Sequence, residues 1–215
     1  MKQVMFDIDG TLIQSSGFDD ACYEASIKEV TGINIKSNWS TYPHVTDSGI
    51  LKTFIERQAP QLEFKTLEAQ VKAVFIRKIA EHLQHSPAVE VEGAIDFLER
   101  LNADKDISVS IATGGWRETA MLKLKSAGFD TGGLVLSSSS DHYSRIEIMK
   151  HAADSVSNTQ EYSFTYFGDA EWDVRACLEL NVNLVVIGDK VKHSQSLPNF
   201  KNYKKAIGFV SGYKP

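Results

Sequence analysis

The sequence has few cysteines, no long apolar run and no excess of basic side chains. Cys22 and Cys177 are its only cysteines, and with no signal sequence evident we expect two reduced thiols in a cytoplasmic protein. No apolar run approaches the roughly 20 residues that a membrane-spanning helix needs. With 23 Lys and Arg against 28 Asp and Glu, the chain lacks the basic face typical of nucleic-acid or anionic-membrane binding. We therefore expect neither nucleic acid nor a membrane as a partner.

The remaining composition is that of a globular protein, and its patterning divides the chain in two. Hydrophobic residues make up 42% of the 215 residues, enough for one sizeable core with a small additional module. After a first strand that ends near Asp7, residues 15–88 contain no strong strand and predict helices near Asp19–Val30, Thr46–Arg57 and Thr66–His85. The last of these carries apolar residues at a spacing of three and four, which is typical of an amphipathic helix.

From about residue 91 onward, helices and strands alternate. The predicted helices are Gly93–Asn102, Trp116–Ser126, Arg145–Asp154 and Glu171–Leu180, and the predicted strands are Ile107–Thr113, Leu134–Ser137, Phe164–Gly168 and Leu184–Gly188. Such alternation predicts an α/β fold with a buried parallel sheet. The first strand would join this sheet, so we expect a discontinuous core of residues 1–14 and 89–215 that is interrupted by a helical insert of residues 15–88.

Polar residues end the predicted strands of this sheet. They are Asp7 after the first strand, Thr113 after the second, the run Ser137–Ser140 after the third and Asp169 after the fourth. Ligands of open parallel sheets bind beyond the carboxyl ends of the strands. These residues therefore predict a site along one rim of the sheet.

The first of these strand ends carries two carboxylates, Asp7 and Asp9, ahead of Gly10. Residues two apart on an extended chain face the same side. Two neighbouring anions suit a divalent cation between them, or acid chemistry in which one carboxyl holds a proton. The alternative is a hairpin turn, since Asp-Gly between apolar residues is also a turn signal.

Two later strand ends carry an anion-binding and a second acidic pattern. Thr113-Gly114-Gly115 offers a hydroxyl and free amides at a helix start, which can hold an anion or form only a turn and cap. Asp169 and Asp173 are four apart, a spacing that suits a metal ligand and its neighbour on one helical face. In the alternative reading, Asp169 is an N-cap and Asp173 a first-turn acid favoured by the helix dipole.

Arg145 follows the third strand, within Ser144-Arg145-Ile146-Glu147. The pattern predicts a capping box that fixes the helix start. A cation in the first turn opposes the helix dipole and therefore needs a partner, such as an anionic substrate. The alternative is a solvated surface arginine.

In this order and at successive strand ends, the motifs Asp7-x-Asp9-Gly-Thr-Leu, Thr113-Gly-Gly, Arg145 and Gly-Asp169-x-x-x-Asp173 resemble those of the haloacid dehalogenase superfamily. Within it, the chain resembles phosphatases with a helical cap after the first strand, such as the phosphoglycolate phosphatase group. The resemblance covers the whole chain. It implies a Rossmann-like parallel-sheet core with an inserted all-helical cap that acts as a mobile lid, hinged near Ser15–Gly17 and Ser86–Glu90.

The resemblance also implies roles for the rim residues. Asp7 would be the nucleophile that forms an aspartyl-phosphate, and Asp9 the general acid and base. Asp7, the Asp9 backbone carbonyl and Asp169 would bind Mg²⁺, with Asp173 as a further ligand or a supporting group. The Thr113 hydroxyl and the Gly114 amide would hold phosphate oxygens.

The chain departs from the family pattern at Arg145, where a lysine is usual. Arginine retains the charge and a bidentate grip on phosphate but not the shape of a compact ammonium; Lys150 is a second candidate for this role. We expect a magnesium-dependent phosphatase, monomeric or homodimeric, acting on a small phosphorylated metabolite such as phosphoglycolate or a sugar phosphate. A phosphomutase with the same cap, or a non-catalytic ligand- or protein-binding domain, remains an alternative.

Overall fold

The computed structural model describes residues 2–15, 17–156 and 163–211; Ser16, part of a predicted hinge, lies outside them. Its main sheet has six parallel strands in the order β5-β4-β1-β6-β7-β8. The strands are β1 (Lys2–Phe6), β4 (Ile107–Ala112), β5 (Leu136–Ser137), β6 (Phe164–Gly168), β7 (Asn183–Ile187) and β8 (Ser196–Leu197). The predicted α/β fold with a parallel sheet is confirmed.

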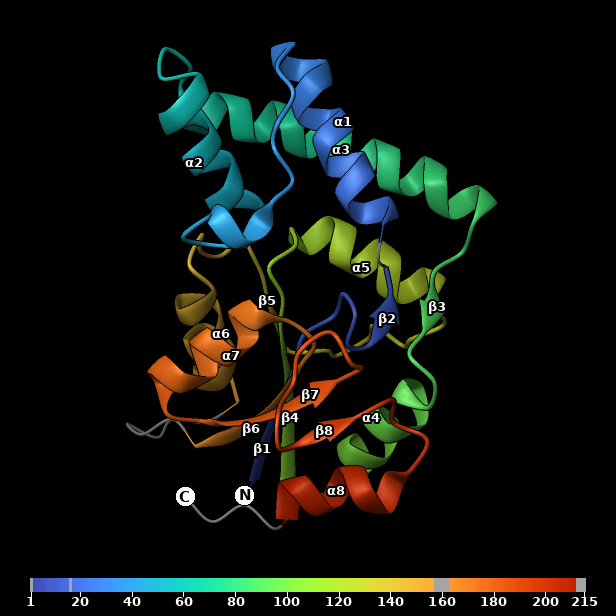
Figure 1. Cartoon of the computed structure of the whole chain (residues 1–215). Helices are drawn as coiled ribbons and strands as arrows, with labels where there is room; N and C mark the ends of the chain where they lie inside the picture. Colours follow the sequence, from blue (N-terminus) through green and yellow to red (C-terminus); the bar gives the residue numbers. More distant parts are fainter. Residues whose placement is uncertain (1, 16, 157–162, 212–215) are drawn as a thin grey trace.

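Helices cover both faces of this sheet (Figure 1). Alternate residues of β1 enter two clusters: Val4 and Phe6 pack with α4 (Ala94–Ala103), α5 (Arg117–Ser126) and α8 (Tyr203–Ser211), whereas Met5 packs with α6 (Arg145–Asp154) and α7 (Glu171–Leu180). Each fully buried apolar side chain of this size contributes about 1.5–3 kcal/mol. Burial on both faces accounts for the continuous apolar runs Val4–Phe6 in β1 and Leu184–Ile187 in β7.

The helical insertion lies beyond the carboxyl ends of the strands (Figure 1). It consists of α1 (Phe18–Thr31), the 3₁₀ helix η1 (Trp39–Thr41), α2 (Asp47–Gln58) and α3 (Phe64–His85). Its own apolar cluster includes Tyr23, Phe54 and Phe75, and also Trp116 from the start of α5. The predicted helical insert is confirmed, and Trp116 fastens it to the sheet domain.

The two chain crossings between sheet and insertion run side by side. β2 (Ile13–Gln14) pairs antiparallel with β3 (Val89–Glu90). The predicted limits of the two parts, at residues 14/15 and 88/89, fall beside this ribbon and stay predictions. Within the described residues, no helix combines the length and apolarity needed to cross a bilayer.

Two expectations need correction. The strand expected over Leu134–Ser137 is only Leu136–Ser137, and the sequence reading missed β8 and α8. The capping box at the start of α6 is wrong: Ser144 is the N-cap but its side chain makes no capping bond. The Ser144 amide donates instead to His142 Nδ1 at 2.9 Å, and Glu147 accepts from Lys150 at 2.9 Å.

Candidate active site

Parallel pairing brings the predicted strand ends together. Phe6 of β1 is in register with Ile111 of β4 and Phe167 of β6. Asp7 and Asp169 follow these strands, and the Asp7 amide continues the ladder by donating to the Phe167 carbonyl at 2.9 Å. The rim expected from the sequence therefore exists at the carboxyl ends of β1, β4 and β6.

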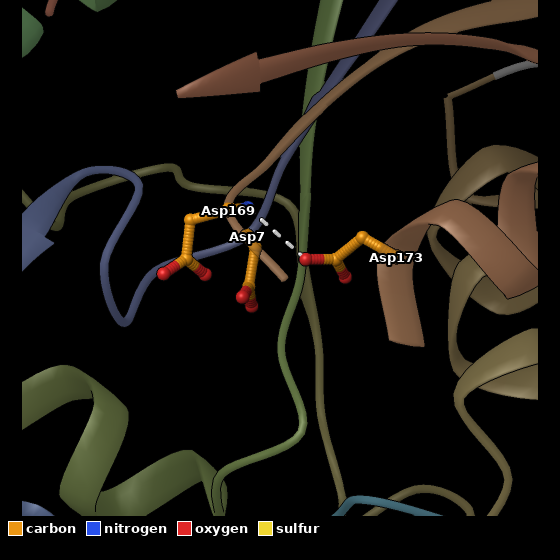
Figure 2. Close-up of side chains that lie close together, drawn as sticks. All are labelled: Asp7, Asp169 and Asp173. Atoms are coloured by element: carbon orange, nitrogen blue, oxygen red, sulfur yellow. Dashed lines mark hydrogen bonds between the residues drawn. The ribbon is translucent and has the colours of Figure 1, made fainter. Parts of the chain in front are cut away.

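Three buried carboxylates meet at this rim. Asp7, Asp169 and Asp173 each place an oxygen within 4.8 Å of the others, and Figure 2 shows the Asp7 side chain between the other two. Both carboxylate oxygens of Asp173 are engaged, because one accepts from the Asp169 and Ala170 amides at 3.1 Å and the other from Arg145. Asp173 thus supports the Asp169 loop. It is also an acid in the first turn of α7, as the non-functional alternative predicted. The predicted N-cap is wrong, because Ala170 and not Asp169 holds that position.

Arg145 lies opposite these carboxylates and is buried. Its Nη1 donates to Asp173 at 3.1 Å and to the Tyr166 hydroxyl at 3.3 Å, and it lies 3.7 Å from Asp7 Oδ1. Its Nη2 donates to the Val45 carbonyl of the insertion at 3.3 Å. Burial disfavours the guanidinium, but the anionic neighbours outweigh this and raise the pKa of Arg145 above its usual value. The surface alternative for Arg145 is therefore wrong, whereas Lys150 pairs with Glu147 outside the cavity described below.

Asp7 has capacity for a further ligand. Its side chain is buried, and Oδ1 has no hydrogen-bond partner. Burial raises the pKa of Asp7 well above its usual value, while Arg145 opposes that shift. A buried polar atom without a partner is unfavourable, so this oxygen fits the binding of a cation or an electrophile.

Glycines permit the close packing of the rim. Gly10 has φ +84°, and a Cβ there would lie 2.0 Å from Asp169 Oδ2. A Cβ at Gly114 would lie 2.7 Å from Arg145 Nη2. Side chains at either position would displace the charged groups, which explains why the predicted turns carry glycine.

The Thr113 loop lies beside Arg145, as predicted. Thr113 is buried, and its Oγ1 accepts from the Gly115 amide at 3.2 Å. The Gly114 carbonyl accepts from the Asp47 amide of the insertion at 2.8 Å. The loop therefore forms the turn that one hypothesis predicted. Anion binding by this loop, which lies next to Arg145, stays a prediction.

Lys190 is a site residue that the sequence reading missed. Its Nζ donates to Asp169 Oδ2 at 2.6 Å. Burial raises the pKa of Asp169, and Lys190 opposes the shift. The rule applied to the other strand ends would have found this residue, since Gly188-Asp189-Lys190 directly follows β7.

Lys123 is the second missed residue. Its Nζ donates to the two carboxylate oxygens of Asp9 at 2.6 and 2.7 Å and to Asp19 at 2.6 Å. Burial disfavours the ammonium, but Asp19 and Asp9 raise its pKa above the usual value. Burial raises the pKa of Asp19 to about 6, against the effect of Lys123. A sequence signal existed, because Lys123 shares the buried face of α5 with Ala120 and Leu124.

The sheet and the insertion enclose a cavity of about 180 Å³. We call its two sides the core half and the insertion half. The core half includes Asp7, Asp9, Thr113, Gly114, Arg145, Asp169 and Lys190, and the insertion half includes Asp19, Asp20, Tyr23, Trp39, Thr46, Asp47 and Ile50. Of the predicted site residues, Asp7, Asp9, Thr113, Gly114, Arg145 and Asp169 therefore line one cavity, whereas Asp173 supports Asp169 from behind, and Ser137–Ser140 and Lys150 do not line it.

A search of protein-family models identifies residues 4–187 as a haloacid dehalogenase-like hydrolase. The chain belongs to this family. No curated protein matches the sequence. The haloacid dehalogenase-like fold also recurs in solved structures of low sequence identity, which support the fold alone.

Three of these structures illustrate the likeness. β-Phosphoglucomutase from Clostridium difficile has a TM-score of 0.75 at 13% identity, covering 99% of this chain and 98% of that one. A hydrolase from Pseudomonas syringae has a TM-score of 0.71 at 19% identity, covering 90% and 88%. A CbbY mutant from Rhodobacter sphaeroides in complex with xylulose-(1,5)bisphosphate has a TM-score of 0.69 at 14% identity, covering 94% and 96%.

Proposed function

We propose that this hydrolase is a magnesium-dependent phosphatase that cleaves a small phosphate monoester through an aspartyl-phosphate on Asp7. The observation that carries the proposal is the buried carboxylate of Asp7, whose Oδ1 accepts no hydrogen bond from the described residues and lies 3.7 Å from Arg145, and which has an oxygen within 4.8 Å of an Asp169 oxygen. A nucleophile needs a free oxygen, and an anionic substrate needs a cation beside it. Both conditions are met at the same point of the rim.

The residues present also fit Mg²⁺. Carboxylate and carbonyl oxygens are the ligands that this ion prefers, and Asp7, the Asp9 backbone carbonyl and Asp169 would hold it, with Asp173 supporting Asp169. Asp7 Oδ1 accepts no hydrogen bond that a cation must displace and is only ion-paired with Arg145 at 3.7 Å, whereas Asp169 Oδ2 would have to exchange Lys190. When bound, Mg²⁺ offsets the repulsion between the carboxylates and a phosphate and favours the ionised form of Asp7.

Each residue of the site then has its own role in the reaction. Asp7 attacks phosphorus while the ester oxygen leaves, and Asp9 gives that oxygen a proton so that a neutral alcohol departs. Asp9 next takes a proton from water, whose oxygen attacks the aspartyl-phosphate and releases phosphate and the Asp7 carboxylate. Thr113, Gly114 and Arg145 hold the phosphate oxygens through both steps.

The charge of the cavity favours one of the two expected substrate types. Among the described residues, the insertion half supplies Asp19, Asp20 and Asp47 and no Lys, Arg or His. A carboxylate on the leaving group, as in phosphoglycolate, would find no cation in the described part of this half to pair with, and any of these three acids that is ionised would repel it. Hydroxyl groups would instead donate hydrogen bonds to these carboxylates. A sugar or polyol phosphate therefore suits the cavity better than phosphoglycolate.

The acidic insertion half and the buried Asp7 also favour a phosphatase over the alternative functions. A phosphomutase that uses an aspartyl-phosphate passes its phosphoryl group to a second oxygen of a phosphorylated substrate, so one phosphate of the bisphosphate would face the insertion half. The carboxylates there disfavour it. A non-catalytic binding domain would have no use for the free oxygen of buried Asp7, which costs stability.

Hydrolysis of p-nitrophenyl phosphate with and without Mg²⁺ tests the proposal. We expect magnesium-dependent release of nitrophenol that Asp7→Asn abolishes, while Asp189→Asn, which changes an exposed carboxylate at the same rim, leaves it intact. Activity that survives Asp7→Asn, or no turnover of any phosphate ester by the wild type, would contradict the proposal.

A further inference from the structure

Lys123 is a fully buried cation that the mechanism above does not use. Its side chain has 0% exposure, and it rises from α5, the helix that lies between the sheet and the insertion (Figure 1). It joins two segments that are far apart in sequence: Asp9, beyond the end of β1, and Asp19, in the first turn of α1.

The ammonium of Lys123 is saturated by these two carboxylates. A lysine has three N–H donors, and the three contacts at 2.6, 2.7 and 2.6 Å go to Asp9 Oδ1, Asp9 Oδ2 and Asp19 Oδ1. A buried charge without such partners is strongly unfavourable. Lys123 therefore cannot release either carboxylate at low cost. It holds Asp9 through both oxygens, and each of these keeps a second lone pair that can carry the proton exchanged with the leaving oxygen or with water.

This grip fixes where the Asp9 carboxylate lies. Asp9 Oδ2 is near the Thr113 loop, since it would lie 3.9 Å from a Cβ placed at Gly115. On that side Asp9 borders the cavity together with Thr113 and Asp47. An acid that must reach the leaving oxygen has to be on this side of the rim.

The third contact makes the position of Asp9 depend on the insertion. Asp19 follows Gly17, whose φ of +98° marks the entry to α1. The insertion contacts the rim elsewhere too, through Asp47 Oδ2, which accepts from the Trp116 amide at 2.7 Å. Because α1 packs on α3 and α3 packs on α5, Asp19 can satisfy Lys123 only while the insertion stays seated on α5.

We propose that Lys123 is a positioning residue that aims the acid–base carboxylate Asp9 at the leaving oxygen, and that Asp19 ties this position to the seating of the helical insertion on the rim. This inference rests on the proposed phosphatase function. It assigns Lys123 no contact with substrate; it acts through Asp9.

The effect of a variant on kcat/KM for esters with good and poor leaving groups distinguishes a positioning role from a merely structural one. A structural defect would lower kcat/KM for both esters alike. Nitrophenolate departs readily without a proton, whereas the alkoxide of glycerol 2-phosphate does not, so only the second ester needs the acid. Because kcat/KM ends at release of the alcohol, it reports this step and not the later attack of water. For Lys123→Met we expect kcat/KM to fall about 100-fold for glycerol 2-phosphate and less than about fivefold for p-nitrophenyl phosphate.

Two further variants complete the experiment. Asp19→Asn keeps the side-chain shape and should show the same selective loss at roughly tenfold, which gives a second reading if Lys123→Met yields little folded protein. Lys125→Met changes an exposed lysine of the same helix and should alter neither ester.

The outcomes are distinct. Equal losses on both esters, or no loss on either, with a magnesium-dependent wild type would overturn the role of Lys123 and leave the phosphatase intact. A wild type that hydrolyses neither ester would overturn the phosphatase proposal and this inference with it.

Discussion

The two halves of the cavity differ in charge although they share one space. The core half pairs its carboxylates with cations, since Arg145 lies against Asp7, Lys190 against Asp169 and Lys123 against Asp9. The insertion half presents Asp19, Asp20 and Asp47. Asp19 forms an ion pair with Lys123. Burial raises the pKa of Asp47 well above its usual value.

This difference indicates a division of tasks. A phosphate is attracted to the half that has cations and helix-start amides. The leaving group is then left with the half that offers mainly hydrogen-bond acceptors.

Arg145→Met should have the largest effect. Loss of the cation beside Asp7 removes stabilisation of the charged phosphoryl group, and kcat/KM should fall by about 10²–10³. Arg145→Lys should recover part of this loss, because the ammonium keeps the charge but not the planar fork. Arg100→Met, which removes an exposed arginine 55% accessible in its ion pair with Asp96, is the control. If Arg145→Met and the wild type had similar kcat/KM values, Arg145 would have no role in binding or stabilising the phosphoryl group.

Asp169→Asn tests the metal side of the core half. The substitution keeps the size of the side chain but removes a charged ligand, so the Mg²⁺ concentration for half-maximal activity should rise at least about tenfold. The measurement is activity against Mg²⁺ titrated into chelator-treated protein. An unchanged midpoint would exclude Asp169 as a ligand.

Asp20→Lys reverses a charge in the insertion half. Asp20 is exposed at the cavity wall and accepts from Trp39 Nε1 at 3.0 Å. With a cation there, the ratio of kcat/KM for phosphoglycolate to that for glycerol 2-phosphate should rise about tenfold, which corresponds to ~1.4 kcal/mol. Glu56→Lys, a charge reversal on the exposed side of α2, should leave the ratio unchanged. A similar rise in both variants would mean that overall charge, not the cavity wall, governs the preference.

Trp116→Phe should have the smallest effect. The smaller phenyl ring would still occupy most of the indole's place in the apolar cluster of the insertion, but the bond from Trp116 Nε1 to Ser48 Oγ at 2.9 Å would be lost. We expect the free energy of unfolding to fall by about 1 kcal/mol. Denaturant unfolding of Trp116→Phe, Ser48→Ala and the double variant would measure the coupling, and strictly additive losses would argue against this bond.

The sequence was sufficient where one physical rule determines the outcome. Strand ends in a parallel sheet share a rim, so Asp7, Thr113 and Asp169 were predicted together and lie together. The position of Arg145 at the start of α6 likewise predicted that it would face the rim. Its hydrogen bonds to Asp173 and Tyr166 hold it there, without the expected capping box.

Contacts made across the fold were not predictable in this way. Lys123 and Asp19 come from two helices whose packing depends on how the insertion seats on α5, and no local spacing encodes that contact. The charge contrast of the cavity was missed for the same reason, because Asp19, Asp20 and Asp47 line one wall only after α1 and α2 fold over the rim.

The most direct test of the division of tasks is the ratio of kcat/KM values of the wild-type protein, with Mg²⁺, for glycerol 2-phosphate and phosphoglycolate. The two esters are similar in size and differ in whether the leaving group carries a second anion. We predict that the neutral leaving group is preferred at least about tenfold, since the described residues of the insertion half offer the carboxylate no cation and oppose it with their own acidic side chains. Equal or faster hydrolysis of phosphoglycolate would contradict the account.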